Sequence, residues 1–289
     1  MTGRRPLLLA GLVALMALLA CAPPPAVDQS LLPAQDREVP LTAAAPDARP
    51  PAGGYLALRP PGAFDLLPDD ERAAAMVRRS TWEPRQQNTA ANQAVAPADF
   101  RPAGYPGMLN ESAIFGRITG NFTGTTDEII QWGAAKWGLP DDLVRAQAVV
   151  ESGWFQNHKE PDGKPIDQQG YGDFGDCGGS PDASGYGPDG PSSFGLLQAK
   201  WCTLNDPDQS GFGGWPWTEN STAYAVDTYG AIMRACLEGW DVWLGPEYKP
   251  GDVWGCAGRW FAGGWYNPPA NDYIHRVQQA LRDKPWLRW

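Results

Sequence analysis

The sequence has few of the residues that build metal sites. It contains two histidines, His158 and His275, and its five cysteines include no Cys-x-x-Cys pair. Structural zinc sites need such ligands at short spacings, so we expect no zinc site. The segment 206–211 begins like a calcium loop, but Trp217 stands where that loop needs a bidentate glutamate, so we expect a turn there. We therefore predict no metal and no cofactor.

Basic residues are also in deficit, with 23 Lys and Arg against 33 Asp and Glu and a formal net charge of −10. Such a chain gains no affinity from neutralising phosphates, so we expect no nucleic-acid partner.

No internal repeat and no sustained alternation of apolar and polar residues is present. Aromatic residues are abundant, with 14 Trp and 9 Tyr. Most such rings build the core, but exposed ones can bind the apolar faces of sugars.

The N-terminus has the pattern of an export signal. Two arginines precede the apolar run Leu7–Ala20, and Cys21 follows it. Fourteen residues are too few to span a bilayer, and the order of basic, apolar and small residues is typical of a secretory signal over residues 1–20. Leu18-Leu19-Ala20-Cys21 resembles a bacterial lipobox, which implies a lipid on Cys21 and an exported protein anchored to the cell membrane or outer membrane. The alternative is an ordinary signal peptide in which Cys21 is incidental.

The rest of the chain divides into three parts by composition. Residues 21–68 are rich in Pro and Ala, which predicts a disordered tether. We expect residues 69–119 to form an N-terminal arm, beginning with a short helix over 69–80, that lies on the main domain through Trp82 and Phe100. Residues 120–289 form the predicted main domain.

The main domain has a mainly α pattern. Thr125-x-x-Glu128 is a capping box, which predicts a helix to Trp137, and Pro140 opens a second helix that ends near Glu151. Periodic apolar residues predict further helices over 222–238, 253–262 and 271–282. A long Gly/Asp/Pro-rich loop over 156–192 separates the two groups of helices, and its Tyr171 is a candidate for a groove wall.

Apart from Cys21, four cysteines remain, and an even number on an exported chain suggests two disulfides. Four cysteines allow three pairings. Cys236 lies near the end of one predicted helix and Cys256 near the start of the next, so a Cys236–Cys256 bridge would join the two helices. The remaining pair, Cys177–Cys202, would then tie the long loop to the chain that follows it.

Glu151 is the strongest candidate for a catalytic acid. It follows Val144 and Ala148 along one apolar helix face, near the negative end of the helix dipole. Burial and the dipole both disfavour a charged carboxylate and raise its pKa. A carboxyl that stays protonated near neutral pH is what a general acid for glycosidic cleavage needs. The alternative is a helix-end glutamate that points into water.

A second stretch, Gly195-Leu196-Leu197-Gln198, joins Glu151-Ser152 in a pattern that resembles bacterial lytic transglycosylases of the soluble-lytic-transglycosylase and goose-type lysozyme-like family (SLT domain). That family pairs Glu-Ser with a downstream Gly-Leu-Met-Gln. Residues 260–263 and 273–277 are similar to the family's Tyr-Asn-Ala-Gly and Tyr-Val-x-x-Val ending. Leu197 replaces the usual methionine, and the gap between the motifs is much longer than in the family. The resemblance covers roughly the C-terminal 170 residues, a plausible domain length.

The resemblance implies a lysozyme-like fold and one essential residue, Glu151. Glu151 would cleave the β-1,4 bond between N-acetylmuramic acid and N-acetylglucosamine in peptidoglycan and leave a 1,6-anhydro product. The family's tyrosine that holds the glutamate would correspond to Trp260 or to Tyr266. The resemblance and the aromatic positions together predict these substrate-binding residues: Ser152, Trp154, Tyr171, Gly195, Leu196, Leu197, Gln198, Trp260, Phe261, Trp265, Tyr266 and Tyr273.

Three other functions remain open from the sequence. A hydrolytic lysozyme would need a second carboxylate, for which the loop offers four candidates, namely Asp162, Asp167, Asp173 and Asp176. A chitinase-like glycosidase could use the same fold on another polysaccharide. A non-catalytic lipoprotein could keep the groove and only bind the cell wall, although the presence of Glu151 argues against it. In each cell-wall interpretation the partners are peptidoglycan glycan strands and, through Cys21, a membrane.

Overall fold

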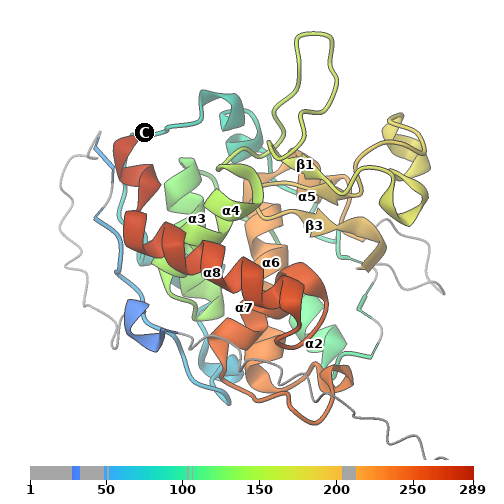
Figure 1. Ribbon diagram of the computed structural model, residues 1–289. Coiled ribbons are helices and arrows are strands. Elements are labelled where there is room, and N and C mark those ends of the chain that lie inside the picture. Colours follow the sequence, from blue (N-terminus) through green and yellow to red (C-terminus); the bar gives the residue numbers. More distant parts are fainter. Residues whose placement is uncertain (1–27, 33–48, 51, 103, 106, 204–212) are drawn as a thin grey trace, which may run out of the picture.

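The computed structural model describes residues 28–32, 49–50, 52–102, 104–105, 107–203 and 213–289. Within these residues the chain is mainly helical, as predicted, with eight α-helices and one small sheet (Figure 1). None of the helices in this part of the chain is long and apolar enough to cross a membrane. The predicted signal, Cys21, half of the predicted tether and the segment 206–211 lie outside the described residues.

Two helices joined by a short turn precede the candidate acid, and Glu151 lies near the C-terminal end of the second one. Helix α3 spans Thr126–Trp137, and α4 spans Asp141–Ser152. The predicted capping box is present, because Thr125 Oγ1 accepts a hydrogen bond from the Glu128 amide and the Glu128 carboxylate accepts one from the Thr125 amide. Gly138, at φ 66°, closes α3 in the left-handed conformation that glycine adopts without strain.

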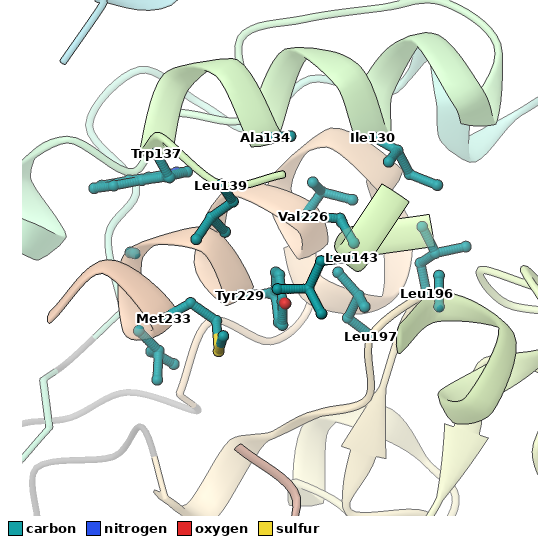
Figure 2. Packing of buried hydrophobic residues seen from close by; sticks show 14 of the residues in the cluster. Ile130, Ala134, Trp137, Leu139, Leu143, Leu196, Leu197, Val226, Tyr229 and Met233 are labelled. Carbon is teal, nitrogen blue, oxygen red and sulfur yellow. The ribbon is translucent and has the colours of Figure 1, made fainter. Parts of the chain in front are cut away.

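Helix α6, Thr222–Glu238, forms the centre of the core, and every one of its residues except Glu238 is buried. It packs against α3, against α7 (Val253–Ala262), and against the short helices α2 (Glu111–Gly116) and α5 (Trp217–Asn220). Glycines allow α3 and α6 to approach closely, because a Cβ at Gly230 would lie 2.2 Å from Trp137 Cδ1. Figure 2 shows the resulting packing of Leu143, Leu197 and Tyr229.

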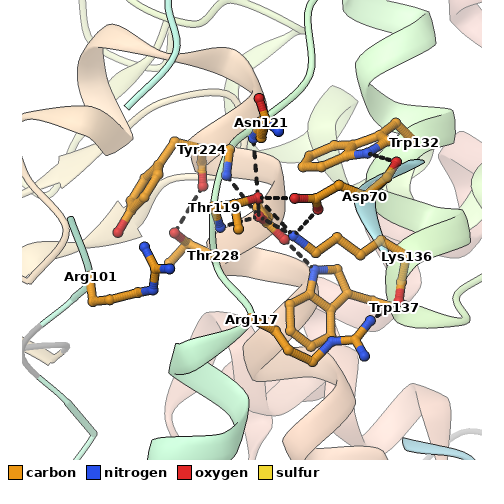
Figure 3. A network of polar contacts seen from close by, with 12 residues as sticks. Asp70, Arg101, Arg117, Thr119, Asn121, Trp132, Lys136, Trp137, Tyr224 and Thr228 are labelled. Atoms are coloured by element: carbon orange, nitrogen blue, oxygen red, sulfur yellow. Dashed lines mark hydrogen bonds and ion pairs between the residues drawn. The ribbon is translucent and has the colours of Figure 1, made fainter. Parts of the chain in front are cut away.

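A buried ion-pair network joins the arm to α3 and α6 (Figure 3). Lys136 Nζ lies 2.7 Å from Asp227 Oδ2 and 2.6 Å from Asp70 Oδ1, and the Trp137 indole donates to Asp227 Oδ1 at 2.6 Å. Asp227 also accepts the backbone amide of Thr119 at 2.8 Å. Charges this deep are tolerated because each has a partner. Asp70 begins helix α1, Asp70–Ala75, which is shorter than the helix predicted over 69–80.

Residues 52–68 belong to the folded domain and not to the predicted tether. The backbone amides of Tyr55 and Leu56 donate to Asp141 Oδ1 at 2.9 and 3.0 Å, and both side chains are buried in the core. Sequence composition suggested disorder because Pro and Ala offer few large apolar groups. The hydrogen bonds to Asp141 and the burial of Tyr55, Leu56 and Leu67 in the core nevertheless hold this segment in place. The predicted tether therefore extends too far toward the C-terminus.

The arm contacts the main domain at the two predicted aromatic residues. Trp82 packs edge-on against Trp154, with ring centroids 5.8 Å apart. Phe100 packs edge-on against Trp217 and Tyr224. The arm is therefore part of the same core.

The small sheet includes part of the long loop as its first strand. Its strands β1 (Tyr171–Gly172), β2 (Ser193–Phe194) and β3 (Ala199–Lys200) are antiparallel, with Tyr171 opposite Phe194 and Phe194 opposite Ala199. Two-residue strands are too short to leave an alternating pattern, so the sequence did not predict them. The turn between β2 and β3 is the predicted Gly-Leu-Leu-Gln motif.

Both disulfides pair as predicted. Cys236–Cys256 joins α6 to α7, and Cys177–Cys202 joins the long loop to the segment after β3. The last helix, α8, spans Pro268–Asp283 and packs against α4 and α7, so it brings the C-terminal part of the chain next to Glu151.

Candidate active site

A cleft of about 660 Å³ opens beside the C-terminal end of α4. Glu151 lines it together with residues of the small sheet, of α7 and of α8. Among the predicted acid and substrate-binding residues, the cleft is lined by Glu151, Gln198, Trp260 and Phe261. The sheet side contributes Asp173 and Lys200, and α8 contributes Arg276. The motifs that are separated in the sequence therefore meet around one carboxyl group.

Glu151 is half-buried, and its burial raises its pKa from 4.5 to about 8. The hydrogen bond from Tyr273, the positive charge of Arg276 and the Trp260 indole each favour the charged form, but together they do not offset desolvation. The negative charge of Asp173 raises the pKa further. Glu151 is therefore protonated at neutral pH and can act as an acid.

A chain of hydrogen bonds from three helices holds Glu151. Tyr273 Oη donates to Glu151 Oε1 at 2.5 Å, Gln147 Nε2 donates to Tyr273 Oη at 3.0 Å, and Tyr229 Oη donates to Gln147 Oε1. The two tyrosines and Gln147 are fully buried, and burial holds the pKa of each tyrosine well above its ordinary value, so both stay neutral donors. Every donor points toward Glu151. With Oε1 accepting, a protonated Glu151 carries its proton on Oε2.

The tyrosine that supports Glu151 is thus Tyr273. Of the two residues expected in that place, the Trp260 indole also favours the charged form of Glu151, whereas Tyr266 bonds a different carboxylate. Tyr266 Oη instead donates to both carboxylate oxygens of Asp252 at 3.0 Å, and Trp265 packs edge-on against Tyr266 and Tyr248. The Trp260 indole donates to Leu197 O at 3.2 Å and forms part of the cleft. The expected match relied on residues within or next to the 260–263 motif. The hydroxyl that bonds the Glu151 carboxyl instead belongs to Tyr273 on the next helix, α8.

Ser152 and the Gly-Leu-Leu-Gln turn join α4 to the sheet. Ser152 Oγ donates to Leu196 O at 2.7 Å, and Leu196 and Leu197 are fully buried in the core. The predicted contacts of these three residues with substrate are replaced here by contacts within the protein. Their arrangement fixes the end of α4, and with it the position of Glu151, relative to the sheet.

Gly195 and Gln198 differ in their relation to the cleft. Gly195 has φ 86°, and a Cβ there would lie 2.3 Å from Thr218 O, so the close approach that requires glycine is to the protein's own backbone and not to a sugar. Gln198 lines the cleft, with its side-chain Nε2 bonded to Gly195 O at 2.9 Å. Gln198 is therefore the member of this motif that is placed to meet a substrate.

Trp154 and Tyr171 are fully buried and do not line the cleft. The Trp154 indole donates to Arg145 O at 3.0 Å, and Tyr171 Oη donates to Glu219 Oε1 at 2.9 Å. Glu219 also accepts from Tyr186 at 2.6 Å, so it anchors the long loop to α5. Both predicted residues therefore belong to the interior of the protein and not to the cleft surface.

The four loop aspartates separate into two groups. Asp167 and Asp173 line the cleft, while Asp162 pairs with Lys164 at the exposed loop and Asp176 pairs with Lys200. Asp173 accepts a hydrogen bond from Ser193 Oγ at 2.6 Å. Asp173 is thus the loop carboxylate placed to act with Glu151. No cluster of three metal-binding side chains is present among the residues that the structure describes.

Sequence reasoning missed Gln147, Tyr229 and Arg276. Gln147 lies four residues before Glu151 on the same helix, a spacing that places both side chains on one face and could have been used. Tyr229 and Arg276 carry no local pattern that distinguishes them from other helix residues.

Comparisons with protein-family models, with curated proteins and with solved structures each found no match. The fold and the site define a mainly helical protein whose cleft holds one protonated glutamate.

The raised pKa of Glu151 predicts how stability changes with pH. The unfolded chain releases this proton near pH 4.5, while the folded protein keeps it until about pH 8, so the folded state binds more protons in between and loses stability as pH rises. Glu151→Gln removes this effect. We expect the variant to melt at a higher temperature than the wild type at pH 9 and at a similar temperature at pH 4.5, measured by thermal denaturation. A melting-temperature difference that does not change with pH would contradict the raised pKa.

Proposed function

We propose that this protein is a peptidoglycan lytic transglycosylase with a lysozyme-like fold, in which Glu151 is the acid and the base. The observation that carries the proposal is a carboxyl with a pKa of about 8, placed in a cleft and held by Tyr273. The helical core with a short antiparallel sheet on one side of the cleft supports the same assignment.

In the proposed reaction Glu151 first donates its proton to the glycosidic oxygen between N-acetylmuramic acid and N-acetylglucosamine. That bond breaks, and the 2-acetamido group of the substrate stabilises the oxocarbenium-like centre. The resulting Glu151 carboxylate then takes the proton of the muramyl 6-hydroxyl, whose oxygen closes the 1,6-anhydro ring. Tyr273 supports the step in which Glu151 acts as a base, because its hydrogen bond to Glu151 is stronger when the carboxylate is charged. Glu151 ends protonated and no water is consumed.

A hydrolytic lysozyme is the second candidate, and the position of Asp173 favours it. Asp173 lines the same cleft and its charge acts on Glu151, so it could activate a water or stabilise the sugar cation. Asp173 accepts a hydrogen bond from Ser193 Oγ and pairs with Lys200 at 3.4 Å. A chitinase-like activity would use the same pair. A non-catalytic wall-binding protein would have no use for a carboxyl held protonated in its cleft.

Mass spectrometry of the released muropeptides tests the proposal. We expect products with 1,6-anhydro ends, each one water lighter than the product that a hydrolytic lysozyme releases from the same peptidoglycan. The control is a digest with a hydrolytic lysozyme. Reducing ends would instead assign the protein to the hydrolytic class and give Asp173 a direct role.

The proposed location follows the N-terminal pattern. A lipid on Cys21 would anchor the enzyme to a membrane on the exported side, where a Pro/Ala-rich tether lets the domain reach the cell wall. Residues 52–68 belong to the folded domain, and Leu31 and Leu32 also pack against its core, so the tether is shorter than the sequence predicted.

A further inference from the structure

Arg276 is a cation in the cleft that has no carboxylate partner among the described residues. It lies on α8, one turn after Tyr273, and its side chain is exposed. Its charge acts on Glu151, yet its contacts are with two aromatic rings: its Cζ lies 5.1 Å from the ring centre of Phe261 and 5.5 Å from that of Tyr273. The guanidinium is therefore held beside the acid with its hydrogen-bond donors uncommitted.

The other two basic residues of the cleft already have partners. Arg259 pairs with the buried carboxylate of Asp241 at 2.7 Å. Lys200 pairs with Asp176 at 2.7 Å and with Asp173 at 3.4 Å. An anionic ligand would have to compete with these carboxylates for Arg259 or Lys200, but not for Arg276.

Phe261 adds an apolar surface next to this cation. Its ring is 47% exposed and stacks on Tyr273, with centroids 4.7 Å apart and planes 4° from parallel. A large exposed aromatic ring in a cleft can bind the C–H face of a pyranose. Because Tyr273 also bonds Glu151, the same stack fixes the aromatic ring, the cation and the acid relative to one another.

The charge of the whole protein makes a local cation necessary for an anionic substrate. The formal net charge is −10, which repels an anionic polymer at long range. The cleft is lined by three basic residues and three carboxyl residues, and with Glu151 protonated the basic ones are in excess. The cleft is thus locally less acidic than the surface that surrounds it.

We propose that Arg276 binds a carboxylate carried by the sugar that sits on Phe261, so that the cleft selects amino-sugar glycans with free carboxylates, such as muramic acid that carries no stem peptide, over neutral glycans. This inference rests on the proposed function for the glycan backbone and adds the chemical feature by which the substrate is chosen. A planar guanidinium can bond both oxygens of a carboxylate, which a neutral sugar cannot offer.

Binding to matched glycans tests this role. The inactive Glu151→Gln protein is titrated with chitohexaose, which is neutral, and with peptide-free peptidoglycan strands, which keep the carboxylate of each muramic acid. We expect tighter binding to the strands, and we expect Arg276→Gln in this background to weaken strand binding about tenfold while leaving chitohexaose binding unchanged. Arg276→Lys should keep part of the preference because it keeps the charge.

Arg282→Gln is the matched control, since Arg282 is exposed on the same helix and bonds Gln279 outside the cleft. It should change neither affinity. Equal affinity for the two glycans, or unchanged strand binding in the Arg276→Gln variant, would overturn the role of Arg276 while leaving the proposed function in place. Failure of the wild type to cleave peptidoglycan would overturn the proposed function itself.

Discussion

Replacing Glu151 with glutamine is expected to remove nearly all cleavage of peptidoglycan. The amide keeps the shape of the side chain and can still accept a hydrogen bond from Tyr273, but it has no proton to donate to the glycosidic oxygen. General acid–base assistance is typically worth ~10²–10⁴-fold, and a residue that serves as both acid and base can lose more. The measurement is the initial rate at which soluble muropeptides are released from purified peptidoglycan near pH 6.

Asparagine substitutions in the loop provide the controls. Asp162→Asn and Asp176→Asn alter residues outside the cleft, and we expect mild effects. Asp173→Asn separates the two catalytic classes: a mild effect supports a single acid/base, and a loss as large as that of Glu151→Gln supports hydrolysis with two carboxyl groups. Full activity in Glu151→Gln would remove the catalytic assignment altogether.

Replacing Tyr273 with phenylalanine is expected to produce the second largest effect. The variant keeps the ring that stacks on Phe261 but loses the hydroxyl that donates to Glu151. That bond favours the charged form of Glu151, so its loss should raise the pKa of Glu151 further above 8 and move the alkaline limb of the pH–rate profile to higher pH. The charged carboxylate formed in mid-reaction also loses its donor, so kcat should fall about 10- to 100-fold.

The readouts are kcat and the pH dependence of kcat/KM between pH 5 and 10. Tyr266→Phe is the matched control, because Tyr266 bonds Asp252 instead of Glu151. It should leave the alkaline limb where it is. A limb that stays in place or moves to lower pH in Tyr273→Phe would show that Tyr273 does not hold Glu151 in the working enzyme.

The helices were predictable because their ends carry local signals. The capping box at Thr125 and Glu128, the cap at Ser221 and the glycine at 239 are each visible in a few neighbouring residues, and α3 and α6 begin and end where those residues place them. The segment 52–68 was mistaken for tether because its order comes from Asp141, a residue far along the chain. A local pattern cannot report a contact of that kind.

The candidate site was predictable in part for the same reason. The position of Glu151 on an apolar helix face indicated a raised pKa. In the folded protein the pKa of Glu151 is about 8, and desolvation is the main cause. Of the residues that hold it, Gln147 has a local signal, because it lies four residues earlier on the same helix. Tyr273 and Tyr229 were not predictable, because Tyr273 lies 122 positions away and Tyr229 lies on a third helix. The motif positions also could not show that Ser152, Leu196 and Leu197 point into the core while Gln198 faces the cleft.

By itself, the sequence determined the mainly helical class, the ends of α3, α6 and α7, the two disulfide pairs and the candidate acid, because each depends on periodicity, caps or spacing within a short stretch of chain. Helix α8 begins at Pro268, before the predicted start at residue 271. The tertiary structure alone decided which hydroxyl donates to Glu151, which aspartate shares its cleft and which arginine remains unpaired beside it. Those features depend on how α4, α6 and α8 pack together, and desolvation and hydrogen-bond geometry exist only once that packing has formed.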